Sequence, residues 1–85
     1  MKTDAELTLG REPDAVPRAR RFVRDRLAGW PAGLAADAEL VVSGLVTNAS
    51  LHGEPPVTVR LSVGDRVRAE VADAGRSGPR LLQQN

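Results

Sequence analysis

The stretch Leu40-Val-Val-Ser-Gly-Leu-Val-Thr-Asn-Ala-Ser-Leu-His-Gly53 decides the fold, because it has the pattern of a helix that packs on a sheet. At about 100° per residue, one broad apolar face contains Leu34, Ala38, Val41, Val42, Leu45, Val46 and Ala49. The opposite face, which we expect to meet water, contains Glu39, Ser43, Thr47 and Ser50. Asn48 belongs to neither face; it stands at the edge of the apolar one, a turn beyond Gly44. A polar amide in that position needs a partner.

The length of the chain, 85 residues, leaves room for one domain, 1–85, near the small end of what folds without staples. Its lack of cysteine excludes disulfides and thiolate metal sites, and its single histidine argues against a zinc site built by the protein alone. We find no apolar run close to the roughly 18 residues of a membrane helix and no secretory signal. We therefore expect a soluble, cytoplasmic protein with no membrane partner.

The charge pattern does not favour nucleic acid as a partner. The formal net charge is +1, and the only aromatic residues are Phe22 and Trp30, too few for a platform that stacks bases. A nucleic-acid site could be built on the cluster Arg18, Arg20, Arg21 and Arg24. We favour the alternative, a solvated helix face whose long side chains shield the core edge.

Local patterns predict five elements in the order strand, helix, helix, strand, strand. Alternation indicates a strand at 5–9, and helical spacing indicates a helix that begins after Asp14 as N-cap and ends near residue 28. The second helix runs from about residue 34 to Gly53. Alternating residues joined by a two-residue turn, Gly64-Asp65, predict a hairpin over 57–73.

These elements predict a two-layer α/β (α+β) sandwich with both helices on one face of a mixed sheet. The other sheet face should be solvated and should carry Thr58, Arg60, Ser62, Arg68 and Glu70. After Asp73 the pattern lapses, and we expect residues 76–85 to be a loop-like tail.

Two polar features mark a candidate ligand site: Asn48 beside the apolar stripe, and Asp73-Ala-Gly75 where the last strand ends in a glycine loop. A carboxylate can accept a hydrogen bond from an exocyclic amine, and a neighbouring glycine lets a flat ring approach the backbone. An amide oxygen can bind Mg²⁺ together with phosphate oxygens. These are the parts of a nucleotide site, although each alone is a common structural feature.

Three segments resemble the histidine-kinase-like ATPase domains of bacterial anti-sigma factor serine kinases: Ala15-Val-Pro-Arg-Ala-Arg-Arg-Phe-Val23, Ala35 to Gly53, and Val67-Arg-Ala-Glu-Val-Ala-Asp73. The likeness covers residues 5–75 and implies a truncated fold of that kind. It implies ATP and Mg²⁺ as cofactors, with Asn48 holding the metal, Asp73 receiving the adenine amine and Gly75 opening the glycine box. His52 stands where the family has a basic or polar residue near the phosphates; a partly buried helix-end cap is the equal alternative.

Two departures from the family lower the expected activity. The family has a glutamate one turn before the asparagine, placed to assist proton transfer, but this chain has Gly44, and Glu39 points to another face. In the family a flexible lid and a second glycine-rich box follow the aspartate. The lid would begin within 76–85, and this chain stops ten residues after Gly75, so we expect most of the phosphate clamp to be absent, either in a degenerate short relative or in a fragment. A bare sheet edge would then favour a homodimer or another protein partner.

The resemblance implies an ATP-binding regulatory protein that controls a sigma factor or an anti-sigma antagonist by binding, with weak or no phosphoryl transfer. The alternative is a nucleotide-independent interaction module, a pseudo-kinase that binds protein through the first helix and the open sheet edge. Nucleic-acid binding through the arginine cluster ranks last.

Overall fold

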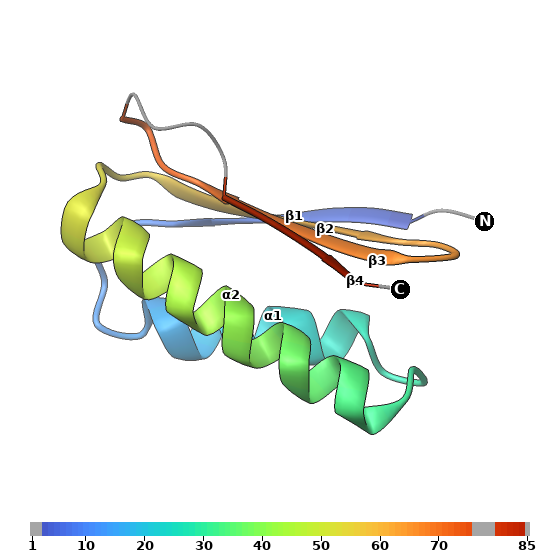
Figure 1. The fold of residues 1–85 in the computed structure, drawn as a ribbon. Coiled ribbons are helices and arrows are strands. Elements are labelled where there is room, and N and C mark those ends of the chain that lie inside the picture. The colour runs from blue at the N-terminus through green and yellow to red at the C-terminus, as the bar shows by residue number, and fades with distance from the viewer. Residues whose placement is uncertain (1–2, 76–79, 85) are drawn as a thin grey trace.

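The computed structural model describes residues 3–75 and 80–84 and has two layers (Figure 1). One layer is a sheet of four strands in the order β1-β2-β3-β4: Thr3–Leu9, Val57–Val63, Val67–Ala72 and Arg80–Gln84. The other layer consists of the helices α1, Ala15–Arg26, and α2, Ala32–His52. The predicted two-layer sandwich, with both helices on one face of the sheet, is confirmed.

All three strand pairs are antiparallel, so the expected mixed sheet is wrong. The connection from β1 to β2 contains two helices that run in opposite directions (Figure 1). The chain therefore returns to the end of the sheet at which β1 stopped, and Val57 pairs with Leu9. A single crossover helix would have carried the chain to the other end, as a parallel pair requires.

Among the side chains that the structure describes, the buried core is aliphatic and lies between the sheet and the two helices. Burial alternates along β2 and β3 as predicted, and each helix buries one stripe. Each fully buried valine or leucine contributes about 1.5–3 kcal/mol relative to an exposed one. The buried residues are Leu9, Ala15, Ala19, Val23, Leu27, Ala38, Val42, Val46, Val57, Val59, Leu61, Val67, Ala69 and Val71.

Two local details differ from the predictions. The hairpin loop has three residues rather than two, because Val63 pairs with Val67 and the Gly64 amide donates to the Arg66 carbonyl oxygen at 3.1 Å. Asp14 precedes α1 but its side chain makes no capping hydrogen bond. Its backbone angles, φ −94° and ψ 13°, are outside the extended region that a capping side chain needs.

Residues 80–84 form β4, where we predicted a loop-like tail. This strand pairs with β3 from Val67↔Gln84 to Val71↔Arg80. Arg80-Leu-Leu-Gln-Gln84 does not alternate between apolar and polar residues, so the sequence carries no strand signal and the pairing with β3 decides the conformation. β3 is therefore an inner strand, and the two edges of the sheet are β1 and β4.

The outer face of the sheet is polar, as expected, and carries an ion pair that joins β1 and β2. Arg60 donates to Glu6 Oε2 from Nε at 3.0 Å and from Nη2 at 2.7 Å, and this hydrogen bond raises the pKa of Arg60. Both side chains are about half exposed, so solvent screens the attraction between them. Glu6 and Arg60 are directly opposite each other in the register of β1 and β2, so the ion pair is consistent with that register.

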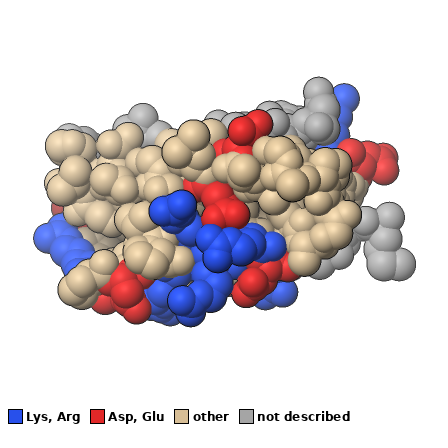
Figure 2. All heavy atoms as spheres, turned by 90° about the horizontal axis from the view of Figure 1, so that it is seen from below, with Lys and Arg blue, Asp and Glu red and all other residues tan. Residues whose placement is uncertain are grey.

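The arginine-rich face of α1 lies on the outside of the helical layer, where Lys and Arg side chains gather with acidic ones beside them (Figure 2). Arg18 Nη1 donates to Glu12 Oε1 at 2.7 Å, and Arg24 Nη2 donates to Glu39 Oε1 at 2.9 Å. The Arg26 guanidinium lies 5.4 Å from the centre of the Phe22 ring. Arg18 and Arg24 of the predicted cluster, and Arg26 beside it, thus have partners within the chain.

By length and composition, α2 meets the criterion for a helix that crosses a membrane, with a mean hydropathy of 1.2 over its best window. Our expectation that no apolar run comes close is wrong in this respect. Core helices of soluble domains meet the same criterion. α2 buries Ala38, Val42 and Val46 beneath the sheet, but only 17% of that window is buried, so α2 meets the criterion by length and composition alone.

Candidate functional site

Three loops meet at one end of the sheet: residues 10–14 after β1, residues 53–56 after α2, and residues 73–75 after β3. The register requires this, because Leu9 pairs with Val57 and Thr58 pairs with Ala72. The predicted Asp73 loop therefore lies beside the C-terminal end of α2, the helix that carries Asn48.

The Asp73 carboxylate is held against the backbone at the end of α2. Its Oδ1 accepts a hydrogen bond from the Gly75 amide at 2.6 Å, and the Ala74 amide donates to the Glu54 carbonyl oxygen at 2.8 Å. A Cβ atom at Gly53 would lie only 2.6 Å from Asp73 Cγ. The carboxylate therefore occupies the space that any other residue at Gly53 would fill.

Asn48 lies on the side of α2 that faces away from α1. It is nine residues from Glu39, which places the two side chains about 180° apart around the helix. Glu39 pairs with Arg24 of α1, so Asn48 points to the opposite side. Its side chain is exposed, so its amide does not need the buried partner that we expected.

The face of α2 that we expected to meet water is partly covered by α1. The Glu39 side chain is only 15% exposed, and Ser50 Oγ, on the same face, is buried without a hydrogen-bond partner in the part of the chain that the structure describes. The prediction for these two residues is wrong because helical spacing places them correctly on one face but does not reveal which neighbour packs there.

His52 and Gly44 both lie at the surface of α2. His52 is in the last turn, next to the residue against which Asp73 rests. Gly44 is inside the continuous helix, and a Cβ atom there would meet nothing within 4 Å. The flank one turn before Asn48 is therefore open, and no carboxylate projects from it.

A family model for the histidine kinase-like ATPase domain matches residues 9–85. The chain belongs to this family. No match was found among curated proteins. The family match spans the segments that carry Asn48, His52, Asp73 and Gly75, and it confirms the histidine-kinase-like part of the resemblance.

The residues of this histidine kinase-like ATPase domain fit a Mg²⁺ ion that is bound mainly by the phosphates of ATP and by water. No group of three His, Cys, Asp or Glu side chains that could hold a metal is present among the described residues. Mg²⁺ commonly takes one or two protein oxygens and completes its shell with phosphates and water. Asn48 would supply one such oxygen, so the metal would arrive with the nucleotide, and the spare acceptor capacity of Asp73 suits an adenine amine.

Sequence reasoning missed two parts of this end of the ATPase domain. Gly53 was expected only to end the helix, whereas it also makes room for Asp73. The sequence did not indicate a role for Arg11, whose Nη2 donates to the Gly53 carbonyl oxygen at 3.3 Å. The loop after β1 therefore reaches the same residue from the other side.

That loop is held by the Glu12 carboxylate. Its own backbone amide, then that of Gly10, and also the charge of Arg18 lower the pKa of Glu12 below its ordinary value of 4.5. A lowered pKa in the folded state stabilises the fold above the unfolded-state pKa, and this stabilisation is lost as the pH falls through the folded-state pKa.

We expect the melting temperature to fall as the pH drops below 4.5, and to fall less steeply in Glu12→Gln. Thermal denaturation of both proteins over a pH series measures the difference. Asp65→Asn, an exposed change in the hairpin loop at the other end of the sheet, is the control and should follow the wild type. Parallel curves for Glu12→Gln and the wild type would contradict the assignment.

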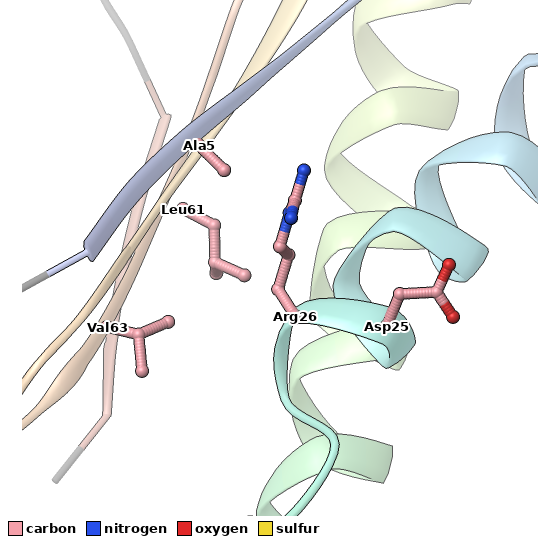
Figure 3. A pocket seen from close by; sticks show the side chains of 5 residues that line it. All are labelled: Ala5, Asp25, Arg26, Leu61 and Val63. Atoms are coloured by element: carbon pink, nitrogen blue, oxygen red, sulfur yellow. The ribbon is translucent and has the colours of Figure 1, made fainter.

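A separate hollow of about 240 Å³ lies toward the hairpin end of the sheet, between α1 and β2. The Arg26 side chain runs along the space between α1 and the strands, across from Leu61 and Ala5, while Asp25 points away (Figure 3). None of the predicted nucleotide residues lines this hollow. It is therefore distinct from the candidate site.

Proposed function

We propose that this chain is an ATP-binding regulatory protein of the anti-sigma factor serine kinase type, acting in the cytoplasm. It would control a sigma factor or an anti-sigma antagonist mainly by binding, with weak or no phosphoryl transfer. The observation that carries the proposal is the Asp73 carboxylate, held against Gly53 at the end of the helix that carries Asn48.

Each site residue has one role in this proposal. Asp73 accepts the adenine amine, and Gly75 lets the ring approach the backbone. Asn48 gives an oxygen to Mg²⁺ on the phosphates, and His52 lies beside them. The bound nucleotide supplies the phosphoryl group; the chain binds and orients it.

Weak transfer follows from the environment of Gly44. The family places a glutamate there, and the structure leaves the position open. Glu39 cannot replace that glutamate, because it is paired with Arg24 on the side of α2 opposite to Asn48. No general base is therefore available beside the proposed phosphate position on α2.

The alternative is a pseudo-kinase that binds protein without nucleotide, through α1 and an open sheet edge. Gly44 favours this alternative because it provides no general base. The exposure of Asn48 also favours it, because water can satisfy that amide when no nucleotide is bound. The two functions differ in one measurable property, the binding of ATP.

Calorimetric titration with ATP and Mg²⁺ separates them. We expect binding to the wild type and a loss of at least about tenfold in affinity for Asp73→Asn, since an amide nitrogen cannot accept the adenine hydrogen bond. The asparagine oxygen can still accept from the Gly75 amide, which preserves the loop. Asn48→Ala should weaken binding with Mg²⁺ and have little effect without it.

Asp65→Asn, which removes an acidic group at the opposite end of the sheet, is the matched control and should bind like the wild type. Absence of heat at millimolar nucleotide would support the pseudo-kinase. Equal binding by the wild type and Asp73→Asn would refute the proposed adenine contact.

A further inference from the structure

The hollow at the hairpin end of the sheet is apolar on its strand side and has a cationic side chain on its helix side. Its volume is about 240 Å³. The strands line it with Ala5, Leu61 and Val63, and the last turn of α1 lines it with Asp25 and Arg26. Ala5 and Val63 are only partly buried, so apolar surface stays open to a ligand. The lining therefore offers both an apolar surface and a positive charge.

Arg26 has no acidic partner in the part of the chain that the structure describes. Arg18 and Arg24, on the same helix, each donate to a glutamate. The Arg26 guanidinium instead lies 5.4 Å from the centre of the Phe22 ring, and Asp25 points away from the hollow (Figure 3). A cation–π contact is an attraction to the face of the ring, so the N–H donors of Arg26 remain available to an oxygen ligand.

Space for a ligand at this place follows from Ala5. Burial alternates along β1, and the residues on its helix side include Ala5, Leu7 and Leu9. Ala5 pairs with Leu61 in the register of β1 and β2. Alanine is the smallest of these side chains and leaves a volume that a leucine would fill. Because β1 is an edge of the sheet, no described strand closes the hollow from that side.

We propose that the hollow binds a small carboxylic acid with an apolar body. The carboxylate would accept hydrogen bonds from Arg26, whose planar fork of donors matches the two carboxylate oxygens. The apolar body would lie against Ala5 and Val63 and would be removed from water. A volume of about 240 Å³ holds about eight water molecules at roughly 30 Å³ each, so a ligand of about eight non-hydrogen atoms fits.

The lining disfavours other classes of small molecule. A cation would be repelled by Arg26, and an inorganic anion would leave the apolar surface of Ala5 and Val63 in water. A purely apolar molecule would gain nothing from the guanidinium. An acid with an apolar body is the class that uses both parts of the hollow.

The proposal does not rest on the proposed nucleotide site. Val63 and Val67 pair at the hairpin end of the sheet, near the hollow, whereas Asp73 and Gly75 follow β3 at the opposite end. We therefore expect the acid and ATP to bind without competing.

Titration of the isotope-labelled full chain, followed by NMR at neutral pH, tests the site with three probes. Hexanoate has the expected size and charge, hexanamide has the same shape without the charge, and acetate has the carboxylate without the chain. We expect hexanoate to shift the amide signals of Ala5, Arg26 and Val63, with a dissociation constant of about 1 mM. Hexanamide and acetate should bind at least about tenfold more weakly.

Two variants test the two parts of the hollow. Arg26→Gln, a change at an exposed residue, should weaken hexanoate binding at least about tenfold and remove the preference for hexanoate over hexanamide. Ala5→Leu should weaken the binding of hexanoate by a similar factor, because the leucine takes the place of the ligand. Arg20→Gln makes the same charge change on the exposed face of α1 and should bind like the wild type.

Absence of shifts at Ala5, Arg26 and Val63 with every probe would overturn the proposal. Equal affinity for hexanoate and hexanamide, or unchanged hexanoate binding in Arg26→Gln, would overturn the carboxylate contact. Since Arg26→Gln leaves the core intact, it decides the contact even where Ala5→Leu lowers stability. Saturating ATP and Mg²⁺ should leave the hexanoate affinity unchanged; failure of ATP to bind refutes the proposed function alone, because hexanoate binding is measured without nucleotide.

Discussion

Replacing Gly53 by alanine is expected to lower the melting temperature by at least about 4 °C and the affinity for ATP at least about tenfold. The added Cβ atom would lie 2.6 Å from Asp73 Cγ and 2.8 Å from the carbonyl oxygen of Ala49. Overpacking of this kind costs about 1–3 kcal/mol. Because the carboxylate is the movable partner, the substitution should displace Asp73 from the end of α2.

The expected effect is steric. Gly53 has φ −99°, which alanine adopts without strain, so conformational freedom is not the cause. Gly33→Ala is the matched control, since a Cβ atom at Gly33 meets nothing within 4 Å. Calorimetry with ATP and thermal denaturation of both variants test the prediction. Wild-type stability and affinity in Gly53→Ala would show that Asp73 is not held at this position.

The five elements predicted from the sequence are present because each has a local pattern of its own. Alternation over 57–63 and helical spacing around Val42 and Val46 need no knowledge of neighbours, and both patterns match the observed burial. β4 lacks such a pattern, and its conformation follows from the β3 edge with which it pairs. The burial of Glu39 likewise depends on α1, which helical spacing in α2 cannot locate.

The residue types of the candidate site could be read from the sequence, and the nucleotide chemistry drawn from them stays a prediction; the contacts at the site could not be predicted. The residue types at Asn48 and Asp73 indicated a nucleotide, and the antiparallel register places the Asp73 loop at the end of the same helix. Asp73 rests against Gly53, which follows the helix that carries Asn48. The sequence did not reveal this contact, because a glycine after a helix is already explained as a helix terminator. Its second role becomes visible only when the space for a Cβ atom is found to be filled by a carboxylate.

Gly44→Glu is expected to hydrolyse ATP at least about 100-fold faster than Gly44→Ala, because a positioned general base contributes about 10²–10⁴ to a proton-transfer step. The position is open and lies one turn before Asn48, so the new carboxylate can reach the flank where the phosphates are proposed to bind. Phosphate release at saturating ATP and Mg²⁺ measures the ratio of the two rates.

Gly44→Ala is the matched control because it shares the gain in helix stability, about 1 kcal/mol over glycine, but adds no carboxylate. Both variants should therefore melt above the wild type, and only Gly44→Glu should gain activity. The double variant Gly44→Glu with Asn48→Ala should lose that gain, since the metal-bound phosphates would no longer be held beside the base. Equal rates for Gly44→Glu and Gly44→Ala would show that a carboxylate at this position is not what limits phosphoryl transfer.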